Sequence, residues 1–165
     1  MRALPCRTSS RFTIGFTLIE LMVALAIMAI VAAVALPLYT QYSDRTFRTM
    51  ARADLMDCSQ ALERWASVRF TYQGSADTDA DGLGDADAGP IADEVCIPQT
   101  EDPGDPSYAI TVATTATTFL LTATPVVGGR MAGDGVARVD DVGNREWDAN
   151  NDGDFTDAGE QGWSH

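Results

Sequence analysis

Residues 15–39 read GFTLIELMVALAIMAIVAAVALPLY, and this stretch decides the architecture of the chain. From Phe16 to Tyr39 it contains a single charge, Glu20. As an α-helix, with a rise of about 1.5 Å per residue, it is about 36 Å long, which is enough to cross a hydrocarbon core of about 30 Å. The sequence therefore predicts a membrane-spanning helix over residues 16–39.

Two general classes of segment fit this pattern incompletely. A basic leader before an apolar run is typical of a secretory signal, and Ala33-Val34-Ala35 offers a conventional cleavage site. A plain membrane anchor is the other class. Neither explains Glu20, because an ionisable group in an apolar helix is costly and usually functional.

The run Gly15-Phe16-Thr17-Leu18-Ile19-Glu20-Leu21-Met22-Val23 resembles the class III signal of type IV pilins and pseudopilins. This resemblance implies that a prepilin peptidase removes residues 1–15 by cutting after Gly15, and that Phe16 becomes N-methylated. It also implies assembly into a filament through the apolar helix. Glu20 would lie one turn inside the new terminus, where its carboxylate can meet the N-terminal amine of a neighbouring subunit or its own.

The composition excludes several functional classes. The chain has no lysine and a net charge of -13, and without residues 1–15 it keeps 8 basic and 24 acidic residues, or -16. Such a surface repels phosphate backbones, so nucleic acid is an unlikely partner. The only histidine is His165 at the C-terminus, and no nucleophile–base arrangement is evident, so we expect no enzyme activity.

Whether the cysteines form a disulfide depends on the compartment in which the chain folds. Cys6 lies in the leader, which leaves Cys58 and Cys96 as an even pair. In an exported chain a disulfide between them is expected, and two buried free thiols are the alternative.

The rest of the chain predicts an α+β head over residues 40–165. An apolar stripe at spacings of three and four extends the helix to about Tyr72, and it includes Cys58 and Trp65. An acidic loop follows over residues 73–106. The sheet is expected within residues 107–145, with three or four antiparallel strands that include Tyr108–Ala113, Thr118–Thr124 and Gly135–Asp140.

The resemblance extends into this head. Residues 39–72, with Gln60-Ala61-Leu62-Glu63-Arg64-Trp65, and the later apolar strands are similar to the PilE-like subgroup of type IVa minor pilins. The resemblance implies the pilin fold, in which a long helix packs on a small antiparallel sheet. No cysteine follows Cys96, so the C-terminal disulfide loop of many pilins is absent, and another device must hold the tail.

Two aspartate-rich loops match the D-x-[DN]-x-[DN]-G start of a calcium loop. In both, a glutamate at the twelfth position is missing, and Glu160 comes one residue late. A solvated acidic loop is the alternative to structural Ca²⁺. The candidate ligands are Asp77, Asp79, Asp81, Leu83 and Asp85 in the first loop, and Asp148, Asn150, Asp152, Asp154, Asp157 and Glu160 in the second.

The sequence thus predicts a type IV pilus subunit that supports adhesion and twitching motility. Its partners would be other pilins, the prepilin peptidase and the inner-membrane assembly platform. It would cross the inner membrane of a Gram-negative bacterium once before it joins an extracellular or periplasmic filament. A type II secretion pseudopilin with a calcium-bound C-terminal loop, and a pilus-tip binding or DNA-uptake pilin, are the alternatives.

Overall fold

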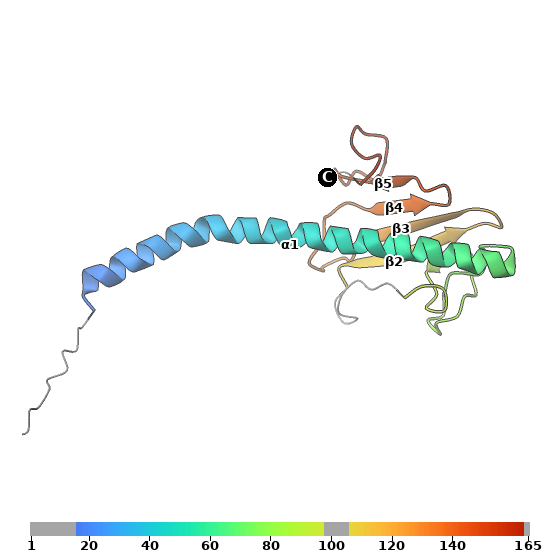
Figure 1. The fold of residues 1–165 in the computed structure, drawn as a ribbon, viewed down its shortest axis with the longest axis horizontal. Coiled ribbons are helices and arrows are strands. Elements are labelled where there is room, and N and C mark those ends of the chain that lie inside the picture. Colours follow the sequence, from blue (N-terminus) through green and yellow to red (C-terminus); the bar gives the residue numbers. More distant parts are fainter. Residues whose placement is uncertain (1–15, 98–105, 164–165) are drawn as a thin grey trace, which may run out of the picture. The chain divides into compact units, whose positions relative to one another are not determined.

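The computed structural model describes residues 16–97 and 106–163. One long helix, α1 (Leu18–Arg69), is followed by five strands (Figure 1). The chain divides into two compact units, one ending at Gln41 and one beginning at Tyr42, and each is described separately. The leader and His165 lie outside the described residues.

α1 is slightly shorter than the predicted helix over residues 16–72. It ends where Phe70 adopts a left-handed conformation with φ of 59°. The Phe70 N–H still donates to the Ala66 carbonyl over 2.7 Å, but α1 itself ends at Arg69. A left-handed residue just past the last turn is a common helix terminator, although glycine is the usual residue there.

In the second unit, α1 buries one face against the sheet. The buried side chains include Phe47, Ala51, Leu55, Cys58 and Leu62, at spacings of three and four residues. They belong to one hydrophobic core with the inward side chains of the strands. The predicted apolar stripe is therefore confirmed, although Trp65 at its end is only half-buried.

The five strands form one antiparallel sheet in the order β1-β2-β3-β4-β5. β2 (Tyr108–Thr114) and β3 (Phe119–Pro125) confirm two predicted strands to within one residue at each end. β4 (Ala137–Asp140) begins two residues later than predicted. β1 (Ala88–Pro90) and β5 (Arg145–Trp147) were not predicted, so the expected count of three or four strands was wrong.

Both additional strands have only three residues, which is too short for an alternating pattern to appear in the sequence. β1 consists of Ala-Gly-Pro, residues that are depleted in strands. It joins the sheet because it pairs with β2, with Gly89 opposite Val112. Part of the segment 73–106, expected to be a loop, is thus drawn into the sheet by a neighbour far along the chain.

A disulfide joins α1 to the segment that carries β1. Cys58 and Cys96 are bonded, with a Cα–Cα distance of 5.2 Å, which confirms the expected pairing. Cys58 is fully buried in the core, and the bond links residues 38 positions apart. It therefore closes a loop that includes the first aspartate-rich segment.

We expect the Cys58→Ala/Cys96→Ala double variant to lose about 3 to 4 kcal/mol of unfolding free energy. The reason is the chain entropy that a crosslink of this loop length removes from the unfolded state. Denaturant titration of the chain in detergent, followed by tryptophan fluorescence, measures the loss.

Reduction of the wild-type chain with dithiothreitol is the control and should give a similar loss, with no effect on the double variant. Equal stability of oxidised, reduced and doubly substituted chains would contradict this prediction.

Candidate functional site

The N-terminal turn of α1 is capped by Thr17. The Thr17 hydroxyl accepts a hydrogen bond from the Glu20 N–H over 3.3 Å, and the Thr17 carbonyl accepts one from Leu21 over 3.2 Å. Thr17 and Glu20 thus stand at the first and fourth positions of a threonine-x-x-glutamate capping sequence. The sequence alone carries this capping signal for the start of the helix. It places the Glu20 carboxylate in the first turn, where the helix dipole favours a negative charge.

Beyond this turn, the apolar side chains of α1 are open to the surroundings. From Leu18 to Leu38 the large hydrophobic side chains are 52–77% exposed. The helix contains an 18-residue window with a mean hydropathy of 2.8, long and apolar enough to cross a membrane. Because water is a poor solvent for such a surface, a membrane or other protein chains must cover it. Gly15, the predicted cleavage residue, lies outside the described residues.

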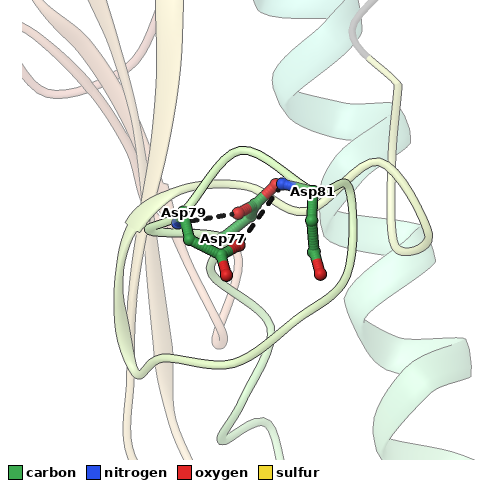
Figure 2. A group of neighbouring side chains, drawn as sticks. All are labelled: Asp77, Asp79 and Asp81. Carbon is green, nitrogen blue, oxygen red and sulfur yellow. Dashed lines mark hydrogen bonds between the residues drawn. The ribbon is translucent and has the colours of Figure 1, made fainter.

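The first aspartate loop brings three carboxylates together (Figure 2). Oxygen atoms of Asp77, Asp79 and Asp81 lie within 4.8 Å of one another. Asp77 is the organising residue, since its carboxylate accepts hydrogen bonds from the N–H groups of Ala80 at 2.7 Å and Gly82 at 2.7 Å. Both donors have positive φ angles, 62° at Ala80 and 86° at Gly82. Three of the predicted ligands therefore share one centre.

These contacts divide the aspartates into two electrostatic groups. Burial acts to raise the pKa of Asp77, but the N–H donors of Gly82, Ala80 and Asp79 outweigh it and hold the pKa below its usual value. For Asp79 the balance is reversed. A backbone N–H bond from Asp81 acts to lower its pKa, but the charges of neighbouring aspartates and burial outweigh that bond and raise the pKa. The loop therefore favours the charge of Asp77 and opposes that of Asp79.

Two predicted ligands in this loop are placed differently. Asp85 accepts hydrogen bonds from the N–H of Thr78 at 3.1 Å and from its hydroxyl at 3.2 Å, and it is not part of the three-carboxylate group. Leu83 donates its N–H to Asp81 over 2.8 Å. The structure gives no contact for its carbonyl, the predicted ligand atom.

The second loop forms a more enclosed group. Oxygen atoms of Asp148, Asp152 and Glu160 lie within 4.8 Å of one another. Asp148 is 1% exposed and Glu160 is 2% exposed, whereas Asp152 is exposed. In the described part of the chain, neither buried carboxylate has an ion pair with an arginine. Glu160 thus joins the group even though it comes one position late for a standard loop.

Backbone donors orient the two buried carboxylates. Asp148 accepts from the N–H groups of Asp152 at 3.1 Å and Gly153 at 3.0 Å. Glu160 accepts from those of Ala149 at 3.2 Å and Asp157 at 3.1 Å. The carboxylates are therefore held close together from opposite ends of the loop.

The other predicted ligands of the second loop lie beside the group. Asn150 donates to the carboxylates of Asp152 and Asp157, both at 2.9 Å. Asp154 accepts from the N–H and the hydroxyl of Thr156, and the backbone bond is the main cause of the lowered pKa of Asp154. Asn150, Asp154 and Asp157 are therefore not members of the three-carboxylate group.

Aromatic stacking and backbone bonds hold the tail where a disulfide is absent. The Trp147 ring lies against the guanidinium groups of Arg48 and Arg52 on α1, at 4.9 and 5.0 Å. Arg52 also donates to the Trp163 carbonyl over 2.9 Å, and the Trp163 indole donates to the Glu146 carbonyl over 3.1 Å. The second loop is thus fixed to α1 from both sides.

This stacking belongs to a wider pattern among the arginines. Of the eight arginines from Phe16 onward, six lie over an aromatic ring, at 3.5–5.4 Å from its centroid. Each of these guanidinium groups therefore has a contact within the head. Within the described residues, only Arg45 and Arg64 have neither a ring contact nor an ion pair, and both are exposed.

Comparison with known families gives two matches that together span residues 14–135. Residues 14–36 match the prokaryotic N-terminal methylation motif. Residues 37–135 match the model described as type IV minor pilin ComP, DNA uptake sequence receptor. The first match covers the N-terminal part of α1 with Glu20, and the second covers the rest of α1 and most of the head, including the disulfide and the first aspartate loop.

The curated relatives are two fimbrial proteins of Pseudomonas aeruginosa. Each is 47% identical to this chain over 49 residues, which are 30% of this chain and 32% of the relative. The chain thus spans about a third of the length of the curated relatives that it matches. No solved structure matches the chain.

Proposed function

The chain belongs to the family of type IV minor pilins, and from this premise we propose that it is a filament subunit processed after Gly15 and assembled through α1. The observation that carries this proposal is the exposed apolar helix with a single carboxylate, Glu20, in its first turn. Members of this family are structural proteins, and we propose no catalytic role. The match to a minor pilin model favours a pilus over a secretion pseudopilus.

Assembly would cover the surface that the isolated chain leaves open. The apolar face of α1 anchors the chain in the membrane before assembly, and we propose that neighbouring helices replace lipid in the filament. Cleavage after Gly15 would create a positive amine beside the Glu20 carboxylate. In an apolar filament core such a pair is poorly screened, and removal of one partner costs several kcal/mol. It would therefore fix the position of each subunit.

Mass spectrometry of the mature chain from its native envelope tests this processing. We expect an N-terminus at N-methylated Phe16 and a mass lower by two hydrogen atoms for the bonded Cys58 and Cys96. A second sample, taken after reduction, controls for the disulfide. An N-terminus at Leu36 would instead identify a conventional secretory signal and overturn the proposal.

We further propose that the second aspartate loop binds Ca²⁺ as a structural ion. Asp148 and Glu160 are buried, lie close together and carry like charges, an arrangement that a hard cation stabilises. The first loop is more exposed, and two of its three grouped carboxylates face solvent. We therefore expect the second loop to bind more tightly than the first, with affinities on the order of 10⁻⁴ to 10⁻³ M typical of extracellular modules.

We expect EDTA to lower the melting temperature of the full chain in detergent by about 2–5 °C relative to calcium at roughly tenfold excess over Kd. The Glu160→Gln variant should lose most of this calcium-dependent shift. Differential scanning fluorimetry with and without calcium measures it.

The control is Asp57→Asn, which neutralises an exposed carboxylate on α1, outside both acidic groups, and should keep the full shift. Equal melting temperatures of the wild-type chain in EDTA and in calcium would show that neither loop needs the ion.

DNA uptake is a second candidate function, supported by the description of the matched family model. The charge of this chain opposes DNA binding, since it has 24 acidic and 8 basic residues from Phe16 onward. Six of these eight arginines also pack against aromatic rings of the head. We propose that any DNA contact is made by another subunit of the filament.

In a retention assay with labelled duplex DNA and the full chain in detergent, we expect no binding at about 150 mM salt. A basic DNA-binding protein serves as the positive control in the same detergent. Binding that weakens steeply as salt is added would contradict this expectation and favour the DNA-uptake function.

A further inference from the structure

A shallow apolar groove lies on α1 just after its membrane-spanning part. It has a volume of about 500 Å³ and is lined by Tyr42, Arg45, Thr46, Thr49 and Met50. Tyr42 is 74% exposed and Met50 is 42% exposed. These residues lie away from the stripe of Phe47, Ala51 and Leu55 that packs on the sheet, so the head leaves the groove uncovered.

The threonines make this groove less polar than its sequence suggests. The Thr46 hydroxyl donates to the Tyr42 carbonyl over 3.0 Å, and the Thr49 hydroxyl donates to the Arg45 carbonyl over 2.8 Å. With their hydroxyls bonded to the helix itself, the two side chains can offer their methyl groups to a partner. The remaining polar groups of the lining are the Tyr42 hydroxyl and the Arg45 guanidinium, and only the guanidinium is charged.

Arg45 is one of the two arginines without an internal partner in the described part of the chain. Glu20 is the only charge on the helix from Leu18 to Gln41, and its neighbours on that helix are exposed and apolar. The groove and this helix therefore have matching surfaces, each apolar with one charge of opposite sign. An Arg–carboxylate pair between them would use the strongest hydrogen-bond geometry available to a carboxylate.

We propose that the Tyr42–Met50 groove receives the apolar N-terminal helix of a second copy, with Arg45 paired to Glu20 of that copy. This inference rests on the proposed filament function. A parallel helix displaced by 25 residues brings the two charges opposite one another, and Leu21 and the residues after it then lie along the groove. A carboxylate has two oxygens, so Glu20 can accept from Arg45 and from an N-terminal amine at once.

Sheared filaments from the host bacterium test the pair. The amount of chain in the sheared fraction is compared with the amount in the membrane by immunoblot. We expect Arg45→Glu to lower the sheared fraction roughly tenfold, because two carboxylates would then meet in an apolar contact. Arg45→Lys should retain most of it.

Arg64→Glu is the matched control, because Arg64 is also exposed and has no internal partner, and the charge change is the same. A second measurement uses two tagged copies, one with Leu21→Cys and one with Thr46→Cys, so that both charges are kept. Oxidation of their filaments should give a mixed dimer, whereas Leu21→Cys with Arg64→Cys should give none. If the groove contacted only lipid, no mixed dimer would form.

Normal incorporation of Arg45→Glu, or the absence of the mixed dimer from assembled filaments, would overturn the inference and leave the filament function standing. Absence of the wild-type chain from sheared filaments would overturn both.

Discussion

The structure depends on one constraint, which is that α1 has to bury two different apolar surfaces. From Phe47 to Leu62 a narrow stripe packs against the sheet and forms the core of the head. From Leu18 to Leu38 the whole circumference of the helix is apolar and exposed. A narrow stripe is satisfied by one small sheet, but an apolar circumference needs a surrounding environment. This part of α1 therefore has to be covered by a membrane or by other protein chains.

The head is a small sheet that needs two attachments to α1. Its sheet has only five short strands, and the outermost two have three residues each. The disulfide from Cys58 fixes the β1 side to α1, and Arg48 and Arg52 fix the β5 side through Trp147. The β1 side of the sheet is thus attached to α1 by a covalent bond, and the β5 side is attached to the same helix by stacking. Each attachment also positions one aspartate loop.

Periodicity and motif made much of this predictable. The helix and its buried stripe follow from an apolar period of about 3.6 residues, and strands β2 and β3 follow from a period of two residues. Both periods depend only on local backbone geometry. The pairing of Cys58 with Cys96 followed from the cysteine count and the inferred compartment. The edge strands could not be predicted, because Ala88–Pro90 and Arg145–Trp147 are too short to show an alternating pattern and become strands only by pairing with β2 and β4. Pattern identified both aspartate loops, but it could not tell that Asp85 turns to Thr78 while Glu160 turns inward.

The sequence alone determined the class of the protein, because an apolar helix that carries one carboxylate behind a glycine is a property of consecutive residues. Only the tertiary structure decided which charges are available. Six arginines that look alike in the sequence lie on aromatic rings, some of them contributed by distant segments, whereas Arg45 and Arg64 stay free of rings. The physical reason is that burial and stacking depend on contacts between segments that are far apart in the sequence, and local spacing does not reveal those contacts.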